Sequence, residues 1–157
     1  MNSMRQRFLA FSLSSTLVLL AGCANVKIEE YGDTSPRLDI AEYFTGETRA
    51  WGMVQDYSGK VQRRFTVDIT GTYEGDTLTL DEAFVFADGE TDQRVWEFER
   101  VDEHHWIGTA NDVEGQVDAR QYGHAFHMRY PLDIEMGERT LSFTMDDWMY
   151  LQPDGRL

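Results

Sequence analysis

From residue 49 onward, apolar and polar residues alternate along most of the chain. The clearest run extends over residues 61–73, where every second residue lies on a mostly apolar face and the residues between them are polar. A period of two residues is typical of a β-strand with one buried face. Runs of this kind predict eight strands, at residues 49–55, 61–73, 78–86, 94–101, 106–110, 113–123, 124–134 and 141–150.

Short turn sequences rich in glycine and acidic residues separate these runs. Each connection is short enough for a hairpin, which favours strands arranged in chain order. The sequence therefore predicts an all-β fold, an antiparallel up-and-down β-barrel of lipocalin or calycin type. Only Arg156 and Leu157 follow the last turn, Pro153-Asp154-Gly155. We expect the last strand to be an open edge, and the natural chain to continue with a further strand.

A helical period precedes the strands. Ser35 and Pro36 are typical of a helix start, and Leu38, Ala41 and Phe44 then share one face. We expect a short N-terminal helix over residues 36–44 that packs on one end of the barrel. The polar residues before it are typical of a spacer.

The start of the chain has the pattern of an export signal. Arg5 and Arg7 precede an apolar run at residues 8–20, which is shorter than the roughly 20 residues that span a membrane. A basic head, a short apolar stretch and small residues after it predict a signal peptide. The ending Leu20-Ala21-Gly22-Cys23 resembles the lipobox of bacterial lipoproteins. This resemblance implies cleavage before Cys23, a diacylglycerol on its sulfur and a further acyl chain, such as palmitate, on its new amine.

These patterns divide the chain into a signal peptide at 1–22, a tether at 23–35 and a β-barrel domain at 36–157. Cys23 is the single cysteine, so the chain forms no internal disulfide. Two or more acyl chains anchor a protein stably in a membrane. In lipoproteins of Gram-negative bacteria, Ala24 in place of aspartate implies the periplasmic face of the outer membrane. The alternative is an ordinary signal peptide followed by a chance cysteine.

The mature chain is strongly acidic. All 28 acidic residues follow Cys23, whereas Arg5 and Arg7 of the 14 basic residues precede it, so the net charge after cleavage is 12 − 28 = −16. Such a surface repels nucleic acid, and we expect no nucleic-acid partner. Solubility alone is a sufficient explanation for this charge.

No pattern in the sequence predicts catalysis or metal binding. Neighbouring residues of a strand point to opposite faces, so Asp146-Asp147 and His104-His105 are each separated by the sheet. No set of three or four ligands is visible on one side. A Gly-x-Ser-x-Gly elbow, a P-loop and a cysteine nucleophile are also missing. We therefore expect a protein that is not an enzyme and that needs no metal or cofactor.

Aromatic and charged residues on the apolar faces are the candidates for ligand binding. The aromatic side chains predict either a filled core or a pocket for an apolar or amphipathic ligand. Charged residues on these faces predict an internal ion cluster, a site in which Arg63 and Arg94 receive an anionic head group, or positions near the barrel ends that reach water. The residues expected to line a ligand site are Arg63, Arg94, Trp96, Trp106, Phe126, Tyr130 and Asp147.

Several segments together resemble one known family. They are Ala50-Trp51-Gly52-Met53-Val54-Gln55-Asp56, Gly59-Lys60-Val61, Arg63-Arg64-Phe65-Thr66-Val67, Asp88-Gly89-Glu90, Arg94-Val95-Trp96, Gly108-Thr109-Ala110, Asp112-Val113-Glu114-Gly115 and Met145-Asp146-Asp147-Trp148-Met149-Tyr150. This combination is similar to the DUF3833 family of bacterial lipoproteins, a domain of unknown function. The resemblance covers nearly all of the mature chain from about Leu38 and implies no activity. Asp118, Arg120 and His124 depart from the residues that the family pattern leads us to expect.

These observations lead to two main functional hypotheses, and to a third, hydrolytic one that would need a cleft with two carboxylates on one side. The first is a membrane-anchored lipoprotein without enzymatic activity that binds a lipid or other hydrophobic molecule in its β-barrel. The second is a module that contacts another envelope protein through its acidic surface or its last strand, a partner that the sequence does not identify.

Overall fold

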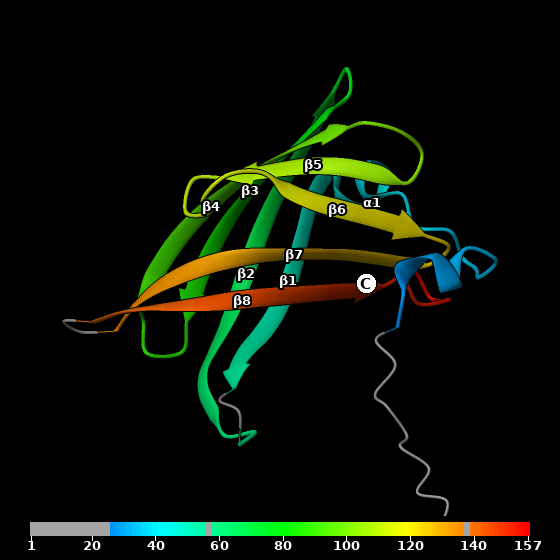
Figure 1. The fold of residues 1–157 in the computed structure, drawn as a ribbon. Coiled ribbons are helices and arrows are strands. Elements are labelled where there is room, and N and C mark those ends of the chain that lie inside the picture. The colour runs from blue at the N-terminus through cyan, green and yellow to red at the C-terminus, as the bar shows by residue number, and fades with distance from the viewer. Residues whose placement is uncertain (1–25, 56–57, 137–138) are drawn as a thin grey trace, which may run out of the picture.

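The computed structural model describes residues 26–55, 58–136 and 139–157 and contains one antiparallel sheet whose strands follow each other in chain order (Figure 1). Each strand pairs with the next one along the chain, so the predicted all-β, up-and-down order is confirmed. The predicted signal peptide and Cys23 lie outside the described residues. The strands are β1 (Gly46–Gln55), β2 (Val61–Glu74), β3 (Thr77–Phe86), β4 (Thr91–Arg100), β5 (His105–Ala110), β6 (Val117–Tyr122), β7 (Ala125–Met136) and β8 (Arg139–Tyr150).

The sheet curls strongly but does not close. Among the described strands, β1 pairs only with β2 and β8 pairs only with β7, so both are edges. Figure 1 shows the resulting open, curled half-barrel. The open edge expected at the last strand is therefore present, whereas a closed barrel is not formed.

The short helix α1 (Ile40–Phe44) begins four residues later than the sequence suggests. Its N-cap is Asp39, whose carboxylate accepts hydrogen bonds from the backbone N–H groups of Ala41 at 2.9 Å and Glu42 at 3.2 Å. The same carboxylate pairs with Arg100 at 2.8 Å, a contact between residues far apart in the chain. This pairing explains why Asp39, and not Ser35, caps the helix.

α1 packs across the sheet at one end of the half-barrel. A Cβ atom built on Gly71 of β2 would overlap the carbonyl oxygen of Phe44, so only glycine permits this close approach. The side chains of Ile40 and Phe44 are 1% and 8% exposed. The prediction that the helix packs on one end of the domain is thus confirmed.

A second short helix, η1 (Ile28–Tyr31), lies inside the segment predicted as a spacer. Ile28 is buried, and the Tyr31 ring contacts His124 at 5.3 Å and Tyr150 at 5.5 Å between ring centroids. The hydroxyl of Thr34 accepts a hydrogen bond from the His124 backbone N–H at 3.1 Å. Residues 28–34 are therefore packed against β7 and β8 and belong to the folded unit.

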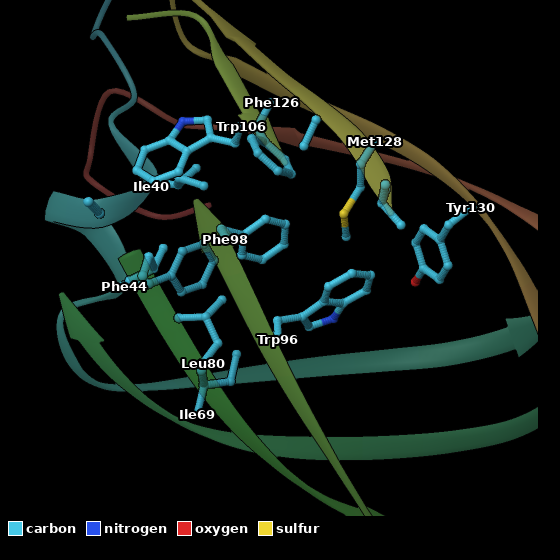
Figure 2. Close-up of a cluster of buried hydrophobic side chains, with 14 of the residues drawn as sticks. Ile40, Phe44, Ile69, Leu80, Trp96, Phe98, Trp106, Phe126, Met128 and Tyr130 are labelled. Atoms are coloured by element: carbon cyan, nitrogen blue, oxygen red, sulfur yellow. The ribbon is translucent and has the colours of Figure 1, made fainter. Parts of the chain in front are cut away.

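The hydrophobic core fills the α1 end of the half-barrel (Figure 2). Trp96 stacks on Phe98 at 5.1 Å, and Phe98 meets Phe126 edge to face at 6.1 Å. Trp106 is completely buried beneath α1. These side chains interdigitate at the packing distances of a protein interior, so this end of the molecule is solid.

Candidate ligand-binding surface

A group of polar side chains lies on the inner face of the sheet, next to the solid core. Pairing of β3 with β4 places Glu82 opposite Arg94, and pairing of β7 with β8 places Asp147 opposite Met128. The Tyr130 hydroxyl donates a hydrogen bond of 2.9 Å to Oδ2 of Asp147. We call Glu82, Arg94, Asp112, Tyr130 and Asp147 the inner polar cluster.

Arg94 is held by a carboxylate that the sequence did not indicate. Its Nε and Nη2 atoms donate to Oδ2 of Asp112 at 2.9 and 2.7 Å. The Arg94 side chain is only 16% exposed, so this pairing satisfies a largely buried charge. Asp112 stands in the turn after β5, where strand periodicity carries no information. Of the three readings open for the inner charges, an ion cluster is the one that the structure forms around Arg94.

Acidic groups outnumber basic groups in this cluster. Burial raises the pKa of Glu82, Arg94 lowers it, and the charges of Asp112 and Asp147 raise it, so that the pKa of this carboxyl lies at about 7. Burial also raises the pKa of Asp147, against the Tyr130 hydrogen bond and Arg94, which lower it. The cluster therefore gains charge as the pH rises through neutrality.

Glu82→Gln is expected to weaken the pH dependence of stability. The carboxyl keeps its proton up to about pH 7 in the folded protein but only to about pH 4.3 when unfolded. The stability that this carboxyl contributes is fully present below its pKa in the unfolded chain. It is lost as the pH rises through its pKa in the folded protein. Urea unfolding at pH 4 and pH 8 measures how far the free energy of unfolding falls between these pH values. This fall should be smaller by roughly 1–3 kcal/mol in the variant than in the wild-type protein.

The matched control for this measurement is Glu97→Gln, on the exposed outer face of β4. It should leave the pH dependence of unfolding unchanged, because Glu97 is exposed and lies on the other face of β4 from the inner polar cluster. An identical pH dependence in Glu82→Gln and the wild-type protein would contradict a buried, proton-retaining Glu82.

The other residues predicted to line a site fall into two groups. Trp96, Trp106 and Phe126 are 2%, 0% and 2% exposed and form the solid core, as Figure 2 shows. Arg63 lies at the opposite end, where it pairs with Asp88 at 3.0 Å and Glu90 at 2.9 Å. The two arginines are therefore occupied by carboxylates of their own, and they do not form a joint site for an anionic head group.

Beyond the inner polar cluster, the inner face remains partly open. Phe65 lies 5.6 Å from Phe84 and 5.7 Å from Phe86 between ring centroids, and all three rings are half-buried. On the two edge strands, Phe143 of β8 is 43% exposed and Val54 of β1 is 40% exposed. We call this surface the open inner face; its members are Val54, Phe65, Phe84, Phe86, Phe143 and Met145.

The open inner face was not predictable from the sequence, because alternation marks which side a residue faces and not which part of a strand extends past the core. Phe84 follows Glu82 on β3, and Met145 is paired with Tyr130 across β7 and β8, so apolar and polar parts adjoin. The surface thus presents half-buried aromatic rings and the exposed ring of Phe143 beside a partly buried polar group. This arrangement suits a molecule with an apolar part and a polar end.

The neighbouring carboxylates of Asp146 and Asp147 lie on opposite faces of β8. Asp147 faces inward to Tyr130, whereas Asp146 faces outward and lies 2.8 Å from Nε2 of His127. The predicted separation of the two carboxylates is confirmed. In the part of the chain that the structure describes, no three His, Cys, Asp or Glu side chains are placed to hold a metal ion. No helix within the described ranges has the length and apolar character needed to cross a membrane.

Comparison with known proteins identifies a family but no activity. The family model described as a protein of unknown function, DUF3833, matches residues 17–157. No curated protein and no solved structure matches the chain. Because the match covers nearly the whole sequence, the chain belongs to the DUF3833 family, whose function is unknown.

Proposed function

We propose that this protein is a lipid-anchored protein of the bacterial envelope that binds a lipid or another amphipathic molecule on its open inner face. The observation that carries this proposal is the group of aromatic rings beside the inner polar cluster, of which Phe143 is exposed and the other three are half-buried. Phe143 alone is 43% exposed on a face whose other half is solid core. A ligand tail laid over these rings would remove apolar surface from water at about 25 cal/mol for each Å².

The inner polar cluster supports a particular kind of head group. It contains three carboxyl groups against a single guanidinium, which Asp112 already engages. An anionic group placed there would be repelled, whereas a hydroxyl or a positively charged amine would be accepted. The ligand that fits both parts of the surface is therefore a neutral or amine-bearing amphipathic molecule.

The anchor in this proposal is Cys23. The lipobox-like ending Leu20-Ala21-Gly22-Cys23 supports acylation at that residue, and Ala24 supports the periplasmic face of the outer membrane. We assign the protein no catalytic role, because each carboxylate of the inner polar cluster is explained by an ion pair, a hydrogen bond or burial. The protein would hold its ligand near the membrane without changing it.

Phe143→Asp is expected to abolish ligand retention. A charge at this position, which carries the exposed ring of the open inner face, would remove apolar contact and repel an apolar tail. The protein is purified from membranes, its bound lipids are extracted, and mass spectrometry quantifies them per protein molecule. The wild-type protein should carry one enriched amphipathic species, and the variant should lose at least about nine-tenths of it.

Val85→Asp is the matched control for that experiment, because Val85 is 48% exposed and lies on the outer face of β3. It should retain the ligand at the wild-type level. A wild-type protein with no enriched species, or equal losses in both variants, would argue against a ligand on the open inner face.

A second candidate function rests on the two open edges. β1 and β8 each leave one row of backbone N–H and C=O groups without a strand partner in the described sheet, and such edges can pair with another protein. A photoreactive residue at Thr144 on β8 would test this function in cells. Recovery of one specific envelope protein would favour it, and recovery of none would leave ligand binding as the better account.

A further inference from the structure

The hairpin of β1 and β2 projects beyond the rest of the sheet. Pairing of β2 with β3 begins at Phe65, whereas residues 61–64 of β2 pair as a strand only with residues 53–55 of β1. A single backbone bond, from Ala87 N–H to the Arg64 carbonyl, ties this part to the next turn. We call residues 53–55 and 61–64 the projecting ribbon. Figure 1 shows the β1–β2 hairpin extending past its neighbours.

The projecting ribbon is unusually apolar for a solvent-exposed hairpin. Among the described residues, nine large hydrophobic side chains are exposed, and four of these nine lie on or beside the ribbon. The exposed fractions are 57% for Met53, 40% for Val54 and 43% for Val61. Trp51, two residues before Met53, is 73% exposed. The ribbon contacts the rest of the sheet through Arg63, whose guanidinium lies 3.6 Å from the centroid of the Phe86 ring. The described core contains no residue of the ribbon, so core packing does not explain its exposed apolar side chains.

The same ribbon is basic in a protein that is otherwise acidic. Arg64 is exposed and makes no ion pair with a described residue, and Lys60 lies immediately before the ribbon. Arg63, by contrast, is neutralised by Asp88 and Glu90. An exposed tryptophan, flexible apolar side chains and a basic group form the combination that binds the head-group region of a bilayer. Tryptophan suits this region because its ring is apolar and its N–H is polar.

We infer that the projecting ribbon, together with Trp51, docks on the surface of a phospholipid bilayer. The inference rests on the anchor part of the proposed function. Only four residues, 24–27, separate Cys23 from η1, and an extended chain of that length spans about 14 Å. An acylated protein would therefore stay at the bilayer surface, where the ribbon meets phosphate groups at high local concentration.

The charge of the protein favours a bilayer over the other candidate partners for the projecting ribbon. A second copy of this chain would bring another net charge of 12 − 28 = −16 against the first, which disfavours self-association. The same charge disfavours strongly anionic membranes. Zwitterionic phospholipids offer phosphate to Arg64 without that repulsion, and they are therefore the partner of the projecting ribbon in this inference.

The test uses the mature polypeptide 23–157 with Cys23→Ser, which lacks signal and acyl chains and retains every described element. It is mixed with vesicles of phosphatidylethanolamine and phosphatidylcholine, with lipid in the millimolar range, and bound protein is measured by flotation. We expect binding, with a shift of tryptophan emission to shorter wavelength. Trp51→Ser combined with Met53→Ser should weaken binding about tenfold or more, and Arg64→Ser about fivefold.

Val101→Ser is the matched control. Val101 is 56% exposed, close to the 57% of Met53, but it follows β4 at the α1 end of the molecule. Its substitution should leave vesicle binding unchanged. Thermal unfolding checks that all variants fold, and it should shift little because the changed side chains are exposed.

Two results would overturn the inference: no vesicle binding by the parent polypeptide, or equal binding by the ribbon variants and the parent. Concentration-dependent self-association that the ribbon variants abolish, without vesicle binding, would assign the surface to a second copy instead. These outcomes are separate from a failure of the proposed function, because acylation of Cys23 and lipid retention are measured on the wild-type protein without vesicles.

Discussion

Cys23→Ser is expected to abolish acylation of the protein. Thioether formation requires the cysteine sulfur, and cleavage at a lipobox follows that modification in the lipoproteins that this chain resembles. Cells fed a labelled palmitate should therefore label the wild-type protein and leave the variant unlabelled. The variant should also migrate more slowly in a denaturing gel, because residues 1–22 stay attached.

Ala24→Asp provides the control for the first prediction. This change keeps the sulfur, so labelling and cleavage should persist, while the resemblance to Gram-negative lipoproteins implies a move from the outer to the inner membrane. Palmitate label on Cys23→Ser, or cleavage of that variant to the wild-type size, would show that Cys23 is not the anchor.

Trp106→Ala is expected to lower the free energy of unfolding by about 3–5 kcal/mol. The Trp106 side chain is completely buried, its ring contacts Tyr73 at 6.3 Å, and the Arg100 guanidinium lies 4.2 Å from the ring centroid. Arg100 in turn pairs with Asp39 at the start of α1. Removal of the indole would leave a cavity and deprive this ion pair of its support.

Guanidinium unfolding followed by circular dichroism would measure this loss. Trp51→Ala is the control, because Trp51 is 73% exposed and its removal should change the free energy of unfolding by no more than about 0.5 kcal/mol. Trp106→Phe should lie between the two, since the indole N–H is buried without a hydrogen-bond partner among the described residues. A loss below about 1 kcal/mol in Trp106→Ala would contradict a solid core at the α1 end.

The strands were predictable because their information is local. Alternation over residues 61–73 marks β2 almost from end to end, and short turns allow only hairpins. The separation of Asp146 from Asp147 follows from the same period of two residues. The pattern within each strand does not determine whether the sheet closes into a barrel. Closure depends on the summed twist and curl of all the strands, which bring β1 and β8 together or apart.

Features that depend on distant partners were not predictable. Ser35-Pro36 has the chemistry of a helix start, but Arg100 draws Asp39 into the capping position from 61 residues away. Asp112 engages Arg94 from a turn, and η1 packs on strands more than 80 residues further along the chain. Burial of Trp96 and Phe126 likewise reflects ring contacts between strands distant in the chain, Trp96 on Tyr130 and Phe126 on Phe98, which periodicity does not encode.

The central claim is that the open inner face holds an amphipathic ligand, and a photoreactive phenylalanine analogue at position 143 tests it most directly. The analogue replaces Phe143, which is 43% exposed on the inner face, or Val85, which is 48% exposed on the outer face. Cells are irradiated, and mass spectrometry identifies what each position has captured. The account predicts a small amphipathic molecule at position 143 and none at position 85. Capture of nothing at position 143, of the same lipids at both positions, or of a protein at position 143 would contradict it.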